Sequence, residues 1–464
     1  MPAPLDRRQI LVLESVRRFL RRGAFAHLLN LLAKTRPQDF APLYEEMTER
    51  EQVALFRALA ERDPELGAAF LVELAPGSGP GLLRRLGPQP AARLLEQCAD
   101  DDAADLLTEL EEEEAKAILE AMRPEEKAGV EQLLIFEEET AGRIMTPEVF
   151  SLPEHYTVSE AIRELQTRGS VEMAFYVYVV DERNHLVGVL SLRDLLLHPP
   201  DTRLSEIMNT DLITVRTDTD QEEVARIAAK YDLIAIPVLD DQGRLVGMVT
   251  IDDVIDVLRE EATEDIFRMA GTSEEERIEP SIWKSVRTRS PWLVATFCGG
   301  MLASFVISGF QPTLQRVVGL AAFIPIVLGM GGSAGNQTAI VVIRGLATGR
   351  IHEGVLLRSF LREIGVAAVL GMVYGLLLAA GSFATLHWLS GLPADRALPV
   401  AIVVGSSLAM SMTVATLVGS LLPLALHRLG IDPAISTTPF VTTTTDVVGS
   451  LIFLGLATTL LAVL

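Results

Sequence analysis

The spacing of hydrophobic residues changes twice along the chain. Up to about residue 137, apolar residues recur every three or four positions, which predicts short amphipathic helices and almost no strand. Between residues 138 and 263, short apolar runs alternate with helical stretches and glycine-bearing turns, which predicts α/β units. From residue 291 onward the chain is largely apolar and predicts membrane helices. The pattern therefore predicts a multidomain protein of α, α/β and all-α membrane parts.

The first region, residues 1–137, consists of short helix-like units. Several begin at Pro, Asp or Thr, for example at Thr48, Pro90 and Asp102, and these residues favour helix N-termini. A stack of short helices is the expected architecture. The region contains no His or Cys cluster and no nucleophile motif, so we do not expect catalysis there.

The middle region contains one pattern twice, in residues 138–200 and 201–263. Each copy has a Met-containing segment, then a helix, a strand, and a second strand that leads into another helix. The segment and the two strand regions are 143–149, 175–181 and 186–195 in the first copy, and 206–211, 234–240 and 245–254 in the second. This arrangement resembles a tandem pair of CBS domains.

In CBS pairs, the second strand often leads into its helix through Ser/Thr-x-x-Asp, and the acid binds ribose hydroxyls. Ser191 with Asp194, and Thr250 with Asp253, have this spacing. The resemblance thus makes an adenine nucleotide such as ATP a candidate ligand. The same residues at the same spacing also form helix N-caps. The sequence leaves both interpretations open.

An acid-rich helix follows the second copy. Asp253, Asp256 and Glu260 are spaced three and four apart and share one helix face. Like charges at this spacing repel unless a cation lies between them, although a solvated face is the ordinary explanation of a charge run. Residues 264–290 then predict an amphipathic connecting helix. Its start is acidic and its end is basic, which matches the helix dipole.

The last region, residues 291–464, contains five apolar segments that are each long enough to cross a bilayer. They are 292–310, 317–343, 364–389, 398–426 and 437–464. Basic residues gather before the first segment and in alternate loops, whereas the other loops contain only Arg316 and Arg396. The positive-inside rule then places the N-terminal regions in the cytoplasm and the C-terminus outside the cytoplasmic membrane.

Charge separates the two halves of the chain. It has 40 basic and 62 acidic residues, but from Pro291 onward only seven Arg, no Lys and five acids. The excess of acid therefore lies in the first half, which argues against nucleic acid as a partner. The two cysteines, Cys98 and Cys298, lie in different halves and show no zinc spacing, which is typical of a reducing compartment.

Asp446 is the only charged residue from about position 437 to the end of the chain. An ionised carboxylate is costly in hydrocarbon, so such a residue normally faces a bundle interior or a water-filled path. It is either an interhelical hydrogen-bonding acid or a cation site in a pore. In the second segment, Gly331 and Gly335 allow close approach of a helix or an ion, and Pro325 with the glycines weakens the helix. Packing explains these glycines better than it explains Asn336.

Over nearly its whole length the chain resembles the MgtE family of magnesium channels. The order of helical N domain, CBS pair, connecting helix and five spans is the same. The runs Pro325–Gln337, Arg344–Thr348 and Gly430–Val447 are close to the family's motifs. Ser333 departs from the pattern, because members commonly have Asn there.

The resemblance implies a homodimer in the bilayer with one Mg²⁺ pore on its two-fold axis. Asp446 matches the pore aspartate, with Gly331, Gly335 and Asn336 nearby. The resemblance also implies regulatory Mg²⁺ between the N domain, the CBS pair and the membrane half. The acids that match those sites are Glu222, Asp232, Asp253, Asp256, Glu261, Glu264, Asp265 and Asp432, with Asp101 and Asp105 as looser matches. Bound Mg²⁺ would neutralise these acids and hold the closed state, and low Mg²⁺ would let them repel.

Three functions are therefore compared. The leading one is a Mg²⁺ channel of the cytoplasmic membrane that cytosolic Mg²⁺ closes. The second is a proton-coupled divalent-cation transporter in which Asp446 carries the proton. The third is a membrane-anchored nucleotide sensor that transports nothing. No nucleophile–base pair or metal-hydrolase spacing appears, so we do not expect an enzyme.

Overall fold

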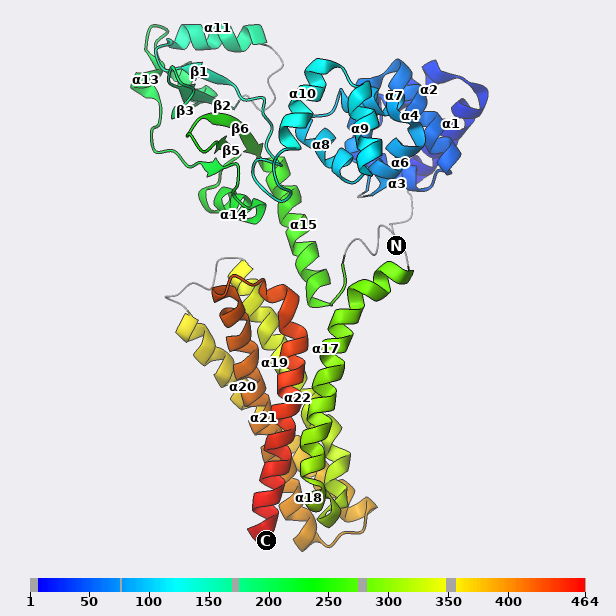
Figure 1. Ribbon diagram of the computed structural model, residues 1–464, viewed down its shortest axis with the longest axis vertical. Coiled ribbons are helices and arrows are strands. Elements are labelled where there is room, and N and C mark those ends of the chain that lie inside the picture. Colours follow the sequence, from blue (N-terminus) through cyan, green and yellow to red (C-terminus); the bar gives the residue numbers. More distant parts are fainter. Residues whose placement is uncertain (1–6, 76, 169–174, 274–281, 348–355, 464) are drawn as a thin grey trace. The chain divides into compact units, whose positions relative to one another are not determined.

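The computed structural model describes residues 7–75, 77–168, 175–273, 282–347 and 356–463 (Figure 1). By their contacts the residues form two compact units, Met1–Arg259 and Glu260–Leu464. Each unit has hydrophobic core clusters of its own. We refer to them as unit 1 and unit 2.

Unit 1 begins with a stack of short helices, as predicted (Figure 1). They are α1 (Arg7–Arg22), α2 (Phe25–Leu32), η1 (Pro37–Asp39), α3 (Ala41–Glu45), α4 (Glu49–Arg62), α5 (Pro64–Val72), α6 (Ser78–Leu86), α7 (Pro88–Leu95), α8 (Asp100–Thr108), α9 (Glu112–Ala121) and α10 (Pro124–Leu133). Local sequence sets the starts of several helices. Thr48 and Glu51 form a reciprocal capping box before α4, and Asp63 caps α5 just ahead of Pro64.

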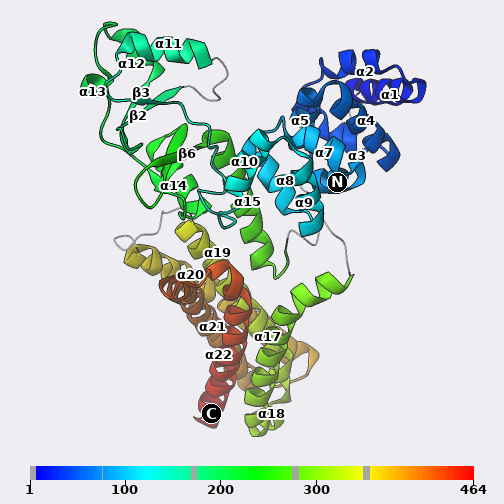
Figure 2. The same ribbon diagram turned by 45° about the horizontal axis from the view of Figure 1, so that its top comes forward.

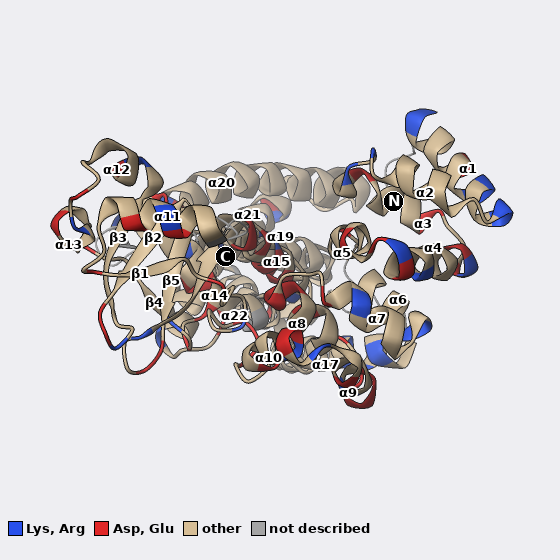
Figure 3. Cartoon of the chain, turned by 90° about the horizontal axis from the view of Figure 1, so that it is seen from above, with Lys and Arg blue, Asp and Glu red and all other residues tan. Residues whose placement is uncertain are grey.

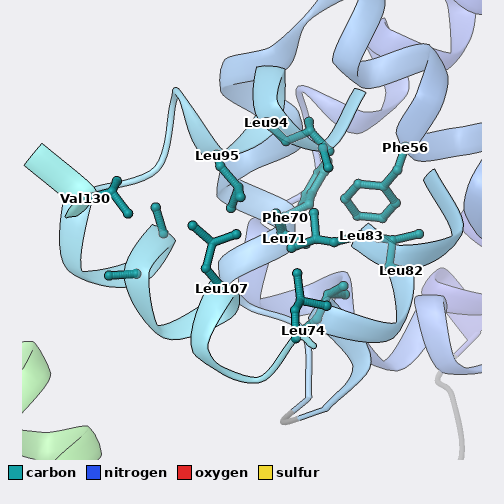
Figure 4. Packing of buried hydrophobic residues seen from close by; sticks show 14 of the residues in the cluster. Phe56, Phe70, Leu71, Leu74, Leu82, Leu83, Leu94, Leu95, Leu107 and Val130 are labelled. Atoms are coloured by element: carbon teal, nitrogen blue, oxygen red, sulfur yellow. The ribbon is translucent and has the colours of Figure 1, made fainter. Parts of the chain in front are cut away.

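Aromatic and leucine side chains from successive helices fill the core of this stack (Figure 4). Phe40 stacks on Phe70 with ring centroids 4.4 Å apart, and both rings are fully buried. Gly67 lies where a Cβ would be 2.5 Å from Leu94, so α5 and α7 pack at close range. Burying one such large side chain is worth about 1.5–3 kcal/mol. This packing stabilises helices that are too short to be stable alone.

The repeated middle region forms two α/β modules, each with a three-stranded sheet. The elements are β1 (Ser151–Pro153), α11 (Val158–Arg168), β2 (Tyr176–Val180), β3 (Leu186–Ser191), α12 (Leu192–Leu197) and α13 (Leu204–Ile207), then β4 (Val215–Arg216), α14 (Gln221–Tyr231), β5 (Ala235–Leu239), β6 (Leu245–Thr250) and α15 (Ile251–Met269). In both sheets the first two strands are parallel and the last two antiparallel, with a register shift at the equivalent place. The sequence repeat is thus a structural repeat.

The Met-containing segment ahead of each module packs on the sheet of the other module. Thr146 forms a β-bridge with Met248 in β6, and Asn209 forms the equivalent bridge with Val189 in β3. A glycine in each of these strands leaves room for the neighbouring methionine. The two modules therefore exchange their leading segments, and neither is closed by its own stretch of chain alone.

Unit 2 contains the end of α15 and the apolar helices (Figure 2). They are α17 (Ile282–Gly309), α18 (Gln311–Arg316), η2 (Val318–Phe323), α19 (Ile324–Ala347), α20 (Leu356–Ala384), η3 (Thr385–Leu389), α21 (Ala394–Arg428) and α22 (Pro433–Val463). Among the described residues, five stretches are long and apolar enough to cross a membrane: 282–309, 318–346, 358–389, 394–428 and 438–460. The prediction of five spans is confirmed.

Helix α21 is the most buried of these spans and packs against α19, α20 and α22. Small residues let the backbones touch. A Cβ on Gly419 would overlap the carbonyl oxygen of Gly335 in α19, and a Cβ on Gly405 would overlap that of Gly375 in α20. Close packing of this kind replaces the hydrophobic effect, which gives no drive to helix association in lipid.

The second span differs from its expectation. The sequence predicts a weakened helix at Pro325 and the following glycines, whereas α19 is continuous from Ile324 to Ala347. Pro325 lies in the first turn, where its missing N–H leaves no intrahelical bond unmade. Gly335 is enclosed by Val441 and Thr445 of α22 and by α21, so tertiary packing stabilises the helical form.

The connecting segment also differs from one amphipathic helix over 264–290. Residues 264–269 are the last turns of α15, and residues 282–290 are the start of α17, continuous with the first span. The segment between includes residues 274–281, which lie outside the described residues.

The crossing of α19 and α21 gives a test of this packing. We expect Gly419→Ala to destabilise the membrane unit by about 1–3 kcal/mol, because the new methyl group would push the two backbones apart. Gly365→Ala in α20 is the matched control, since nothing lies within 4 Å of a Cβ there and alanine favours a helix. Thermal unfolding in detergent measures both, and equal melting temperatures would refute the close crossing.

Candidate functional site

Asp446 lies in α22, fourteen residues beyond Asp432, which is about 21 Å along a helix axis. Its side chain is only partly buried. The hydroxyls of Thr445 and Ser450, on either side, donate to backbone carbonyls of α22 itself. Among the residues that the structure describes, the Asp446 carboxylate has no hydrogen-bond or ion-pair partner. The fold of one chain therefore gives no support to an interhelical hydrogen bond as its role.

The glycine-rich run of α19 lies beside this part of α22. A Cβ on Gly335 would be 3.3 Å from the methyl group of Thr445, and one on Gly332 would be 3.7 Å from the Thr445 hydroxyl. Asn336 follows directly, and its buried Oδ1 has no partner in the described part of the chain. Gly331 packs more loosely, because a Cβ there would be 3.8 Å from Ser411 Cβ of α21. The run is thus adjacent to the residue before Asp446.

The sequence analysis missed two buried hydroxyls in α21. Ser407 and Ser411 are at most 3% exposed, and neither Oγ has a hydrogen-bond partner among the described residues. A Cβ on Gly449 of α22 would lie 3.9 Å from the Ser411 hydroxyl. The spacing of these serines, one helical turn apart in an apolar span, was the available signal.

In unit 1, two of the predicted regulatory acids interact. Asp253, in the first turn of α15, accepts a hydrogen bond from the Thr250 N–H at 3.3 Å. Burial, together with the negative charge of Asp101, raises the pKa of Asp253 to about 7. Asp101 lies in the acidic first turn of α8 (Figure 3).

The neighbouring Asp100 has the same kind of environment. Burial, with the nearby charges of Glu148 and Asp101, raises its pKa to about 6. Half-buried carboxylates that repel one another are a donor set that fits a hydrated Mg²⁺ ion, which prefers oxygen ligands and keeps most of its water.

Asp105, the other acid predicted in α8, already has a counter-charge. Its Oδ1 is 3.3 Å from Nη2 of Arg143, a side chain that is 4% exposed. Arg143 also donates to the Thr108 hydroxyl, while its buried Nη1 has no partner in the described residues. Arg143 belongs to the repeated motif that begins the first module. The structure therefore gives Asp105 an arginine partner that the sequence analysis did not assign.

Three further predicted acids come together in unit 2, where α15 ends and α22 begins. Arg268 Nη1 lies 2.8 Å from Asp432 Oδ2, and Arg268 also pairs with Glu264 one turn earlier. Burial and the charge of Asp432 raise the pKa of Asp265, partly offset by Arg268 and Arg344. We call Glu264, Asp265 and Asp432 the mouth acids.

The remaining predicted acids lie elsewhere on the helices. Glu222 is in the first turn of α14, and Asp232 ends that helix in the left-handed conformation, with φ of 54°. Asp256 is exposed on α15, and Glu261 is half-buried on the same helix. Within the described ranges, no group of three or more His, Cys, Asp or Glu has the geometry to hold a metal ion.

The two nucleotide candidates both cap helices. The Ser191 hydroxyl accepts from the Asp194 N–H, and the Asp194 carboxylate accepts from the Ser191 N–H at 3.0 Å. Thr250 likewise donates its N–H to the Asp253 carboxylate, and its hydroxyl donates to the same carboxylate. The capping interpretation therefore describes both positions, and a role in nucleotide binding stays a prediction.

Comparison with known proteins covers most of the chain. The MgtE family model, described as a divalent cation transporter, matches residues 324–456, and the model of the MgtE intracellular N domain matches 35–139. The CBS domain model matches residues 141–201 and 204–260.

The chain is 44% identical over 340 residues to the magnesium transporter MgtE of Thermus thermophilus, which covers 72% of this chain and 73% of that protein. It is 37% identical over 330 residues to the magnesium transporter MgtE of Bacillus subtilis, covering 71% of each. A crystal structure of the soluble part of a magnesium transporter is similar, with 33% identity and a TM-score of 0.50. That likeness covers 55% of this chain and 99% of the other.

The raised pKa of Asp253 predicts how stability changes with pH. The folded pKa of about 7 exceeds the unfolded value of about 3.9, so between these values the folded state binds more protons. Stability of metal-free protein is then lost as the pH rises through this window. We expect Asp253→Asn to raise the melting temperature in EDTA by a few degrees at about pH 8 and by less at about pH 5.5.

Asp201→Asn is the control for this measurement, because Asp201 is an exposed acid of unit 1 and is not among the charges that raise the pKa of Asp253. It should leave the melting temperature nearly unchanged at both pH values. A gain from Asp253→Asn that does not depend on pH would contradict the assigned protonation.

Proposed function

The chain belongs to the MgtE family, and from this membership we propose that it conducts Mg²⁺ across the cytoplasmic membrane and that cytosolic Mg²⁺ closes the path. The observation that supports the pore most directly is Asp446. It is a carboxylate inside a membrane-spanning helix, partly exposed, with no partner in the described residues. An ionised carboxylate in that position needs water or a cation beside it, because hydrocarbon solvates both the carboxylate and the protonated acid poorly.

In this proposal two chains form a homodimer, and the Asp446 carboxylates of both face one path. Two carboxylates attract a divalent cation through its water shell, and this suits Mg²⁺, which sheds water reluctantly. Gly331, Gly335 and Asn336 lie on α19 beside the residue before Asp446. The orphaned Asn336 Oδ1 is an additional oxygen that can accept a hydrogen bond from such water.

The proposed gate uses the repulsion between acids in the cytoplasmic parts. Asp253 is charged at neutral pH only at a cost, because it is half-buried and close to Asp101. The mouth acids face the same difficulty at the end of α15, and there Arg268 neutralises part of the charge. Bound Mg²⁺ supplies positive charge between such acids. Without it, repulsion favours their separation, and a bias of a few kcal/mol is enough to shift a two-state gate.

The same proposal includes the division of the chain and its orientation. Residues 1–137, 138–200, 201–263, 264–290 and 291–464 are the helical N domain, the two CBS domains, the connecting segment and the membrane domain. The regulatory acids are those of the sequence analysis, from Asp101 to Asp432. The N-terminal domains are cytoplasmic, and the C-terminus is outside.

Asp446→Ala tests the pore. In proteoliposomes with low Mg²⁺ on the regulatory side, we expect wild-type protein to pass Mg²⁺ and the variant to show a flux lower by about tenfold or more. The reason is that each 1.4 kcal/mol of lost ion stabilisation lowers the occupancy of the site about tenfold. Asp395→Asn, which changes an acid in the first turn of α21, is the control and should conduct normally.

Other outcomes of the flux measurement separate the alternatives. Equal flux in wild type and Asp446→Ala would make Asp446 structural. Flux that follows the proton gradient would identify a coupled transporter. A folded wild type that binds adenine nucleotide tightly and passes no ion would identify the membrane-anchored sensor.

The gate has its own test in Asp256→Asn combined with Glu261→Gln. We expect the double variant to need several-fold more cytosolic Mg²⁺ for half-inhibition of flux, because two acids of α15 no longer contribute to binding. Asp201→Asn changes an exposed acid at the junction of the two CBS domains and should leave inhibition as in wild type. An unchanged inhibition curve in the double variant would refute this gate while leaving the pore proposal intact.

A further inference from the structure

The end of α15 is attached to the start of α22 by contacts that need no metal. Thr438 of α22 donates its hydroxyl to the carbonyl oxygen of Met269 at 3.2 Å, which satisfies a carbonyl left over at the helix end. Arg268 forms its ion pair with Asp432, the residue directly before α22. Asp432 also caps α22 by accepting from the Ala434 N–H at 2.8 Å.

The chain folds back beside this contact. Gly271 has φ of 70°, a conformation that suits glycine, and it turns the chain after α15. A Cβ there would be 3.1 Å from the ring of Trp292 in α17. The indole therefore lies next to the turn that follows Arg268, within unit 2.

Arg268 makes these contacts with the same acids to which the proposed function gives regulatory Mg²⁺. Its guanidinium pairs with Glu264 on its own helix and with Asp432 across the gap in sequence of 164 residues. Nothing in the motif that assigned Glu264, Asp265 and Asp432 to a metal site assigns a role to this arginine.

We propose that Arg268 is a tethered cation that occupies the mouth acids when Mg²⁺ is absent and competes with Mg²⁺ for them. This inference rests on the proposed function, since it concerns the ligands of the regulatory ion. The guanidinium cannot lose its proton at any physiological pH, so it can leave the acids only by moving its side chain. It has no lone pair to offer a metal, so it cannot share the ion as a ligand.

Competition of this kind lowers the apparent affinity for Mg²⁺. The affinity is reduced by the fraction of time in which Glu264 and Asp432 are free of the guanidinium. Arg268 and both acids are about one-third exposed, so solvent screens the pairs and each is of modest strength. Removing the guanidinium should then tighten the site by about three- to tenfold.

The proposed role of Arg268 also predicts how the protein behaves when no regulatory Mg²⁺ is bound. An arginine between the acids reduces the repulsion that would separate α15 from α22. Its removal should therefore raise flux at very low Mg²⁺ and, at the same time, lower the Mg²⁺ concentration at which flux stops. A residue that only stabilised the closed contact would instead make closure need more Mg²⁺.

Trp292 provides a readout that does not depend on transport. Trp283 and Trp388 are 81% and 75% exposed, so both can be replaced by Phe to leave Trp292 as the only indole. Mg²⁺ is titrated into the full-length purified protein while Trp292 fluorescence is followed. We expect Arg268→Gln to shift the midpoint to a three- to tenfold lower Mg²⁺ concentration, and Arg268→Lys, which keeps the charge, to stay closer to wild type.

Asp432→Asn tests whether Arg268 acts through its partner. In that background Arg268→Gln should shift the midpoint by less than it does in wild type, because Glu264 is the only acid left for which the guanidinium competes. A midpoint in Arg268→Gln that is unchanged or higher than in wild type would overturn the competition and make the arginine a structural tie.

Failure of the wider proposal looks different. If wild-type protein shows no Mg²⁺-dependent change in Trp292 fluorescence and no inhibition of flux, the mouth acids bind no regulatory ion, and this inference fails with that gate. If Asp446→Ala conducts normally but Arg268→Gln shifts the fluorescence midpoint downward, the pore assignment fails and the tethered cation stands.

Discussion

Repulsion between half-buried carboxylates is the interaction on which the proposed regulatory acids of this chain depend. At Asp253 it acts together with burial to move the pKa from 3.8 to about 7, which corresponds to roughly 4 kcal/mol at 1.36 kcal/mol per unit. Burial is the larger cause, so the mutual repulsion accounts for only part of this figure. Driving a two-state gate from 1:99 to 99:1 needs about 5.5 kcal/mol. One pair of acids is therefore too weak a switch, and several must act together.

Three kinds of contact lower the free-energy cost of keeping these carboxylates partly buried and close together. They differ in how easily each contact can be broken. Thr250 holds Asp253 with two hydrogen bonds that belong to the helix cap and stay in place. Arg143 gives Asp105 a counter-charge from a guanidinium that is itself buried, while the Asp105 carboxylate is 60% exposed. Arg268 gives Asp432 a partly exposed one, which solvent screens. The two arginines differ in their freedom to move: Arg268 is 34% exposed and can leave its acid, whereas Arg143 is 4% exposed and is held by its surroundings. The mouth of unit 2 is thus better suited to respond to ion concentration than the Arg143 contact.

Much of the architecture could be predicted because it is written in local patterns. The five spans follow from uninterrupted apolar runs, and the CBS pair from a pattern that occurs twice. Long-range features could not be predicted this way. The bridge of Thr146 to Met248 joins residues about a hundred positions apart, so no local spacing reveals that the modules exchange segments. The continuity of α19 through its glycines depends on Val441 and Thr445, which lie in another helix.

The candidate sites show the same division. Asp446 could be identified from local sequence alone, because it is a single acid within an apolar segment. The partners of Asp105 and Asp432 could not be identified in this way. The sequence does not distinguish an arginine on the surface from an arginine that neutralises a particular acid. A matching motif identified the acids that could bind a cation, and only the fold showed that three of them, Asp105, Glu264 and Asp432, already have arginine partners.

The packing of unit 2 constrains how a change at the mouth can reach Asp446. Asp432 directly precedes α22, the helix that contains Asp446, so a displacement at the mouth is transmitted along this helical rod, which has Pro439 in its interior between the two acids. The rod is not free, because Gly299 of α17 and Gly335 of α19 hold Thr443 and Thr445 in contacts with no spare room. Gly335 in turn lies against the backbone of α21. Cores packed this closely shift between discrete arrangements and do not deform continuously. In the proposed pore, opening at Asp446 would therefore require α22 to move together with α17 and α19, or to leave one of these glycine contacts for another.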